Sequence, residues 1–344
     1  MKPTFNRCFS IDGRLVGEGA DVYLIAEAGV AHFGSLEKAF ALVDLAAEAG
    51  ADAVKFQIFD INAMISADSA PWRVRLGSRC LPYADFEKIQ AHCRHRKITF
   101  FATAHDEPSL AFLTGLEVPA YKIGSGEVEN WPFLRRIAQL GKPVIFSTGM
   151  YSPEQISEAL SVMASTGNPD IGVLHCITQY PTPPAAVNLP AMAALRQQFD
   201  GVVGFSDHTA GFHFPLAAVA LGAQVIEKHI SLDFNLPDAQ DWKVSCGPHD
   251  LATFVSQVRE LEQGLRPQSQ RSAEEMDNRA WAGKSLVAVR AIAQGERFTP
   301  GRLTSKRPGT GISPAKIDQV IGRVAVKDIA EDSVIHWEDI REET

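Results

Sequence analysis

The amino-acid sequence predicts an α/β fold, a (β/α)8 TIM barrel, followed by a small β-rich domain. Short β-rich runs alternate with helical stretches eight times over about 250 residues, the usual span of such a barrel. Polar and ionisable residues gather at one end of these strands, where barrel proteins carry their sites. No G-x-G-x-x-G motif follows the first strand, which disfavours the main alternative, a doubly wound open sheet.

The strand and helix units follow one another from residue 21. The first strand, DVYLIAEAG, precedes a helix with Ser35 as its N-cap and Gly50 past its C-terminus. A less regular stretch, 58–82, separates the second strand from the second helix. The predicted strands are 21–29, 52–57, 98–103, 120–125, 143–148, 171–176, 202–206 and 225–230. The predicted helices are 35–50, 83–96, 107–115, 131–140, 153–165, 189–199, 212–221 and 249–264.

The alternation stops after Gly264, so we predict a barrel domain over residues 1–264. Residues 265–281 are polar and without a hydrophobic pattern, which indicates a linker. Residues 282–344 contain short β-type pieces with turns, such as KSLVAV and SVIHW. A β-rich domain of about 60 residues has marginal stability alone, so we expect it to be stabilised by contact with a larger unit.

Composition and charge exclude several classes of partner. A net charge of −8 and a pI near 5.7 argue against a nucleic-acid or anionic-membrane partner. The first residues resemble neither a signal peptide nor a transit peptide, and no apolar run approaches the roughly 18 residues of a membrane span. The five scattered cysteines include no C-x-x-C pair, so we expect reduced thiols in a cytoplasmic protein.

The strand ends carry groups suited to an anion. Lys55 and Lys122 each sit in an apolar strand, where a lone ammonium is costly. Each alone is equally explained by a salt bridge or a snorkelling side chain. Two such lysines, with Gly-Ser and Ser-Thr-Gly turns at neighbouring strand ends, are typical of a phosphate or carboxylate site, since hydroxyls and backbone N–H groups add neutral donors.

Two histidines end successive strands, so both imidazoles can face one mouth of the barrel. His208 and His229, with Glu27 and Asp241 nearby, could hold a divalent ion of the Mn, Fe, Co or Zn type. The alternative is a pair of hydrogen-bonded structural histidines. Cys176 lies within an apolar strand, so we expect a buried and inert thiol.

Several stretches carry a resemblance to a known family. They are IAEAGVAHFG, GADAVKFQ, KIGSGEVENWPFLRRIA, GKPVIFSTGM, LHCITQYPTPPAAVNL, VGFSDHTAG, GAQVIEKHISLD and KRPGTGISP. In them the sequence resembles the sialic acid (N-acetylneuraminate) synthase family, which includes legionaminic and pseudaminic acid synthases, with the motifs in the family's order. The resemblance implies a barrel followed by an antifreeze-like (SAF) domain, in a domain-swapped homodimer whose SAF domains cover the partner's site.

The resemblance also implies a reaction. In the family, phosphoenolpyruvate condenses with the open-chain aldehyde of an N-acyl hexosamine, phosphate is lost by C–O cleavage, and a nine-carbon 2-keto acid results. Motif matching assigns the phosphoenolpyruvate site to Lys55, Lys122, Ser125, Ser147, Thr178 and Ser206. It assigns the metal, expected to be Mn2+ with Mg2+ or Co2+ as alternatives, to His208 and His229. It assigns catalytic carboxylates to Glu27, Glu127 and Asp241. We place Arg307, Tyr180 and His105 on the sugar side, Arg307 being supplied by the other subunit.

Departures from the family pattern cluster on the sugar side. Ala31 and Phe33 in AHFG replace two amides, His105 stands in TAHD where the family has TPFD, and Trp242 in AQDW replaces a histidine. These changes indicate an acceptor other than simple N-acetylmannosamine. A second possibility is condensation with another aldose or an aldose phosphate, for which a further basic site would come from His105, Arg73, Arg75 and Arg79. A third is a non-catalytic carbohydrate-binding protein.

Overall fold

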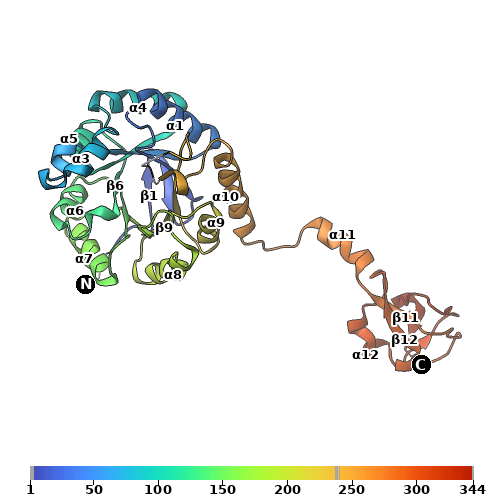
Figure 1. Cartoon of the computed structure of the whole chain (residues 1–344). Helices are drawn as coiled ribbons and strands as arrows, with labels where there is room; N and C mark the ends of the chain where they lie inside the picture. The colour runs from blue at the N-terminus through green and yellow to red at the C-terminus, as the bar shows by residue number, and fades with distance from the viewer. Residues whose placement is uncertain (1–3, 237–238, 240, 343–344) are drawn as a thin grey trace. The chain divides into compact units, whose positions relative to one another are not determined.

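A closed barrel of parallel strands forms the centre of the first compact unit, Met1–Arg266. The computed structural model describes residues 4–236, 239 and 241–342, so Gln240 of the AQDW motif lies outside the described residues. The strands close in the order β10-β3-β4-β5-β6-β7-β8-β9, which confirms the barrel and excludes the open sheet (Figure 1). They are β3 (Tyr23–Gly29), β4 (Ala53–Ile58), β5 (Thr99–Ala104), β6 (Tyr121–Ile123), β7 (Val144–Ser147), β8 (Ile171–Cys176), β9 (Val202–Asp207) and β10 (Val225–His229).

Helices surround the barrel, and each predicted helix is present with its ends shifted by a few residues at most (Figure 1). In the first, the Ser35 hydroxyl accepts a hydrogen bond from the Lys38 N–H, and Gly50 ends the helix at φ 81°, as predicted. The main helices are α1 (Leu36–Ala49), α4 (Tyr83–Arg96), α5 (Glu107–Gly115), α6 (Trp131–Ala138), α7 (Pro153–Ala164), α8 (Leu189–Gln198), α9 (His213–Ala220) and α10 (Leu251–Leu265). The irregular stretch contains the short α2 (Ile61–Met64) and α3 (Ala70–Gly77).

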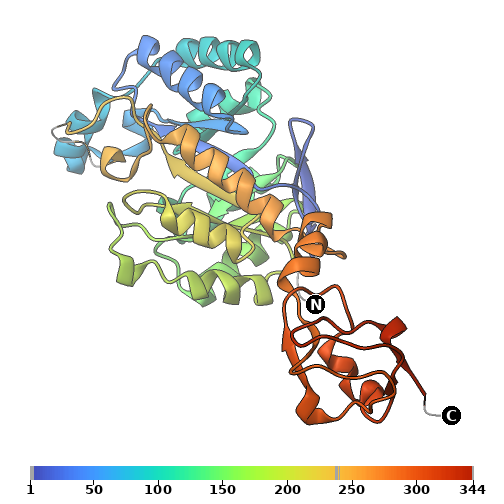
Figure 2. The same ribbon diagram turned by 90° about the vertical axis from the view of Figure 1, so that its right-hand side faces the viewer.

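An antiparallel hairpin that the sequence analysis did not predict precedes the barrel. It consists of β1 (Cys8–Ile11) and β2 (Arg14–Gly17), and it lies at one end of the barrel (Figure 2). Its buried side chains Phe9, Ile11 and Val16 join an inner core with residues near the amino ends of the strands. The hairpin therefore fills that end of the barrel and leaves the other end for a site. The other members of this core are the strand residues Tyr23, Ile25, Ala53, Phe101, Ile145, Leu174, Val202 and Val225, and Ala120 directly before β6.

The second compact unit, Pro267–Thr344, has its own small core. Its strands β11 (Ser285–Ala288) and β12 (Leu303–Lys306) pair antiparallel, as do β13 (Val324–Ala325) and β14 (Ile340–Arg341), and a short helix α12 (Ile317–Val320) is also present. The predicted linker is partly helical, because it contains most of helix α11 (Ala273–Ala282). The Ser272 side chain caps this helix, and Glu274 and Glu275 lie near its positive amino end.

The apolar length of the helices and the state of the cysteines are two further features of the described residues. Within the described ranges, no helix is long and apolar enough to cross a bilayer. All five cysteines are unpaired in the structure, and Cys8 is exposed. Cys176 is buried, and burial raises the pKa of its thiol, as expected for an inert cysteine.

Candidate active site

Side chains at the carboxyl ends of the barrel strands line a cavity of about 140 Å³, called here the strand-end cavity. Successive residues of a strand point to opposite faces, so a strand sends every second side chain inward. On β10, Val225 belongs to the inner core, and Glu227 and His229 follow on the same face and line the cavity. The predicted site residues in the lining are Glu27, Lys55, His105, Lys122, Ser125, Ser147, Thr178, Tyr180, Ser206, His208 and His229.

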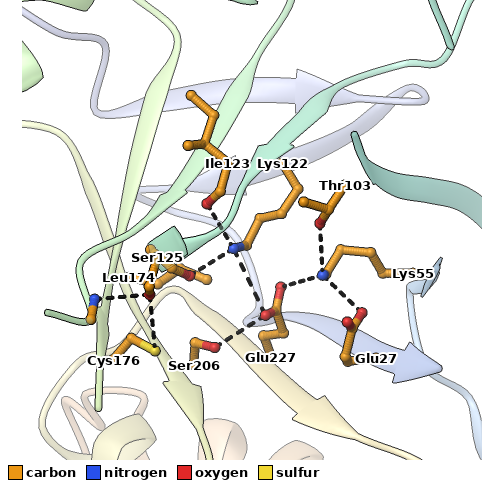
Figure 3. Close-up of polar contacts among 12 residues, drawn as sticks. Glu27, Lys55, Thr103, Lys122, Ile123, Ser125, Leu174, Cys176, Ser206 and Glu227 are labelled. Carbon is orange, nitrogen blue, oxygen red and sulfur yellow. Dashed lines mark hydrogen bonds and ion pairs between the residues drawn. The ribbon is translucent and has the colours of Figure 1, made fainter. Parts of the chain in front are cut away.

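Lys122 is buried in this cavity and donates to two neutral oxygens. Its Nζ lies 2.7 Å from Ser147 Oγ and 3.0 Å from the Ile123 carbonyl oxygen. The nearest carboxylate is that of Glu227, at 3.9 Å (Figure 3). Burial lowers the pKa of Lys122, and the positive charge of Lys55 acts in the same direction. The buried ammonium therefore has no anion at hydrogen-bond distance among the described residues, and an anionic ligand would stabilise its charge.

Lys55 is buried beside Lys122, but its positive charge is better neutralised by nearby carboxylates. Its Nζ lies 2.8 Å from Glu27 Oε2 and 3.6 Å from Glu227 Oε2, and it donates to Thr103 Oγ1 at 3.1 Å. Burial opposes the charge, but the two carboxylates outweigh it and raise the pKa of Lys55. Burial likewise opposes ionisation of Glu227, yet the two ammonium groups outweigh it and lower its pKa to about 2. Glu227 is therefore a shared anion between the two lysines (Figure 3).

Serine and threonine hydroxyls complete the cavity wall. Ser206 Oγ donates to Glu227 Oε1 at 3.1 Å, and the Gly149 N–H donates to Ser125 Oγ at 3.0 Å. A Cβ at Gly149 would lie 2.2 Å from Thr178 Oγ1 and 2.6 Å from Ser125 Oγ, so a larger residue here would displace these hydroxyls. The hydroxyls of Ser125 and Thr178 can therefore pack tightly against the turn that follows β7.

The two predicted metal ligands lie side by side. The rings of His208 and His229 have their centroids 5.3 Å apart. His208 Nδ1 lies 2.7 Å from the Ile177 carbonyl oxygen, which fixes the proton on Nδ1 and leaves the Nε2 lone pair to accept from the Tyr180 hydroxyl at 2.9 Å. Burial lowers the pKa of both imidazoles, so both are neutral and able to act as ligands. Asp241 is close enough for its charge to act on His229.

His105 and Glu127 lead to a second space, called here the adjacent cavity, of about 640 Å³. His105 lines both cavities, and its pKa is lowered to about 4 by burial and by the two lysines, so its ring is neutral. Glu127 lines only the adjacent cavity of the two, where Asn130 Nδ2 donates to its Oε2 at 2.7 Å and burial raises its pKa. Glu127 thus lies next to the strand-end cavity and not in its wall.

Some polar residues at the strand ends face away from the cavity. Lys228 and Asp207 form a buried ion pair of 2.5 Å on the outer face of β10 and β9, and the His175 Nε2 hydrogen-bonds to the Val187 carbonyl oxygen. Arg307 lies in the second unit, where its guanidinium stacks 5.4 Å from the Trp281 ring centroid. Its assignment to the sugar stays a prediction.

Sequence reasoning missed Glu227 and Thr103. Both could have been found from the sequence, because every second residue of a strand points to the same face. Glu227 lies two residues before His229, and Thr103 lies two residues after the inner-core Phe101. Their partners are less predictable, since Glu227 lies between two lysines more than 100 residues before it in the sequence.

The fold and the site define a class: barrel enzymes with a cationic cavity for a small anion, and an imidazole pair, at the carboxyl ends of the strands. Within that class, the chain belongs to the NeuB family, whose profile matches residues 42–270. A SAF domain matches residues 283–341. The predicted family resemblance is thereby confirmed.

Three named proteins match between 80% and 98% of the chain. The N,N'-diacetyllegionaminic acid synthase of Campylobacter jejuni is 40% identical over 328 residues, which cover 91% of this chain and 98% of that protein. The crystal structure of N-acetylneuraminic acid synthetase from Leptospira borgpetersenii, in complex with citrate, matches with a TM-score of 0.74 at 30% identity, covering 80% of this chain and 96% of that one. The spore coat polysaccharide biosynthesis protein SpsE of Bacillus subtilis matches with a TM-score of 0.68 at 36% identity, covering 98% and 100%.

Proposed function

We propose that the chain is a synthase that condenses phosphoenolpyruvate with the aldehyde of an amino sugar, giving a nonulosonic acid and phosphate. The observation that carries the proposal is the pair of buried lysines, Lys55 and Lys122, in a hydroxyl-lined cavity beside two neutral imidazoles. The named relatives support the same product class, since they include legionaminic, pseudaminic and sialic acid synthases.

The strand-end cavity suits phosphoenolpyruvate in charge and size. A phosphate and a carboxylate together carry about three negative charges at neutral pH. A protein with a net charge of −8 needs a local cationic site to bind such a ligand. Lys122 has only neutral oxygens at hydrogen-bond distance, so it is the natural partner of the phosphate. A cavity of about 140 Å³ suits a small metabolite and not a whole sugar acceptor as well.

The reaction balances with water as the third reactant. C3 of phosphoenolpyruvate bonds to the aldehyde carbon, water oxygen bonds to C2, and the C2–O bond to phosphate breaks. The water oxygen becomes the keto oxygen, one water proton ends on the new hydroxyl and the other on phosphate. Lys55, Lys122 and the serine hydroxyls hold the anion. Glu27 in the cavity wall, or Asp241, whose charge acts on His229, moves the proton of the attacking water.

The imidazole pair suits a divalent ion. Both rings are neutral and close, and His208 Nε2 carries a lone pair that could bind an ion in place of its hydrogen bond from the Tyr180 hydroxyl. We propose that His208 and His229 are ligands of the ion; the described residues contain no cluster of three or more His, Cys, Asp or Glu side chains that could hold a metal ion. We propose Mn2+, with Co2+ or Mg2+ as alternatives. When bound, the ion supplies Lewis-acid polarisation of the aldehyde.

The adjacent cavity favours an acceptor without a phosphate group. Of the described residues that line it, the charged ones are acidic: Asp106, Glu107 and Glu127. An anionic sugar phosphate would be repelled there. Arg73, one of the four residues considered for a further basic site, donates from Nε to the Ile65 carbonyl oxygen. Hydroxyl and amide groups of an amino sugar can donate to these carboxylates, and the neutral His105 can accept or donate at the junction of the cavities.

The family resemblance and the SAF match support a homodimeric, cytoplasmic enzyme in which the partner subunit's Arg307 reaches the sugar. Mixing experiments test this. Inactive His208→Ala and Arg307→Ala chains should regain partial activity when they are denatured and refolded together, if each site needs both subunits. No regain of activity argues against a shared site.

Product analysis tests the proposed function. The protein is incubated with phosphoenolpyruvate, Mn2+ and a panel of hexosamines, hexoses and hexose phosphates, and phosphate release and product mass are recorded. We expect phosphate release with an amino sugar and a product heavier than the sugar by a pyruvate unit, and no turnover in excess chelator. Turnover with sugar phosphates only would favour the aldose-phosphate reaction. No turnover with any sugar, together with glycan binding, would favour a carbohydrate-binding protein.

A further inference from the structure

A fully buried ion pair lies directly behind the imidazole pair, on the opposite face of the same two strands. Lys228 Nζ lies 2.5 Å from Asp207 Oδ2, and neither side chain is accessible to solvent beyond 2%. Lys228 immediately precedes His229, and Asp207 immediately precedes His208. The two paired residues also face each other in the register of β9 and β10. The ion pair therefore links the strands one residue before each imidazole.

The lysine holds the chain on both sides of His208. Besides Asp207, Lys228 Nζ donates to the Thr209 carbonyl oxygen at 2.8 Å. Asp207 in turn accepts from the Thr209 N–H at 3.0 Å and from the Thr209 hydroxyl at 3.1 Å. The backbone segment that carries His208 is thus tied at residue 207 and at residue 209 to the strand that carries His229.

A buried ion pair of this kind is weak evidence for a role in stability. The cost of removing two charges from water offsets much of their attraction, and well-packed apolar residues often stabilise a protein equally well. The pair does not contact the strand-end cavity either, because both side chains are on the outer face of the strands. What distinguishes this ion pair is its position. It joins β9 and β10 directly beside His208 and His229, whose ring centroids lie 5.3 Å apart.

We propose that Asp207 and Lys228 are positioning residues for the imidazole pair, and that their ion pair sets the spacing at which His208 and His229 bind a divalent ion. This inference rests on the proposed function only in requiring that the two histidines bind the ion. Residues that orient metal ligands typically change metal affinity 10- to 100-fold when they are replaced.

The test replaces the pair by apolar residues of similar size, Asp207→Leu with Lys228→Met, which leaves no unpaired buried charge. Binding of Mn2+ to the full chain is measured by electron paramagnetic resonance of the free ion, and the absorption spectrum of bound Co2+ reports ligand geometry. We expect about 10- to 100-fold weaker Mn2+ binding and an altered Co2+ spectrum in the double variant. Asp207→Asn, which keeps an acceptor for Thr209, should show a smaller loss.

An ion pair at the other end of the barrel, between the partly exposed Arg259 and the buried Asp52, provides the control. Arg259 lies 2.9 Å from the buried Asp52, and Arg259→Met with Asp52→Asn should lower the melting temperature but leave Mn2+ binding within about twofold. This inference alone is overturned if Mn2+ binding is unchanged in the Asp207→Leu/Lys228→Met protein. If that variant does not fold, unchanged Mn2+ binding in Asp207→Asn overturns it. A wild-type chain that binds neither Mn2+ nor Co2+ overturns the metal part of the proposed function with it.

Discussion

Replacing Lys122 by methionine is the most direct perturbation of the proposed anion site. Methionine has a similar length and no charge, so the change removes the ammonium with little loss of volume. In the wild-type structure the ammonium is held by Ser147 Oγ at 2.7 Å and the Ile123 carbonyl at 3.0 Å, and it is buried. It therefore points into the cavity before any ligand binds.

The expected effect follows from the strength of charged hydrogen bonds. A hydrogen bond to a charged group contributes about 1.5–3 kcal/mol, and about 1.4 kcal/mol corresponds to a tenfold change in affinity. Lys122→Met should therefore raise the KM for phosphoenolpyruvate about 10- to 150-fold. The change also leaves Glu227 with one lysine instead of two, and this extra negative charge acts in the same direction.

Phosphate release is measured at varied phosphoenolpyruvate, and the dissociation constant is measured separately by calorimetry. Lys142→Met is a matched control, because the Lys142 Nζ donates to the Val118 carbonyl oxygen outside the cavity and should leave both values within about twofold. Values for Lys122→Met that equal those of the control would refute the assignment of Lys122 to the phosphate.

Three other predictions follow from single contacts. Gly149→Ala places a Cβ 2.2 Å from Thr178 Oγ1 and 2.6 Å from Ser125 Oγ, so the KM for phosphoenolpyruvate should rise severalfold without a change in charge; steady-state kinetics with an unchanged KM would contradict this. Because burial lowers the pKa of Lys122 below its ordinary 10.5, the ammonium loses its proton early as pH rises, and the KM should increase on the alkaline side before pH 10.5; a flat profile of KM against pH would contradict it. Phe101→Ala removes a fully buried inner-core ring and should lower the free energy of unfolding by about 3–5 kcal/mol in urea titrations, whereas a loss below about 1 kcal/mol would show a loosely packed barrel interior.

Local patterns were sufficient to predict most elements of the barrel. Ser35 and Gly50 marked the ends of the first helix because capping depends on groups within a few residues. The hairpin Cys8–Gly17 escaped prediction because its two strands are only four residues each, and their burial against the strands of the barrel is a tertiary effect. Helix α11 was missed for a related reason, since it has no buried residue that would produce an apolar stripe.

By itself, the sequence determined the repeated unit, the change of pattern after Gly264 and the residue types available at the strand ends, because these depend on short-range periodicity and motif content. Only the tertiary structure decided which of those residues meet. Closure of β10 onto β3 carries Glu227 to within 3.6 Å of Lys55 and 3.9 Å of Lys122, while Lys228, its neighbour in sequence, turns to Asp207 behind the site. Which side chains of a strand face the barrel interior depends on how the strand pairs with its neighbours. That pairing is decided by contacts between residues far apart in the chain.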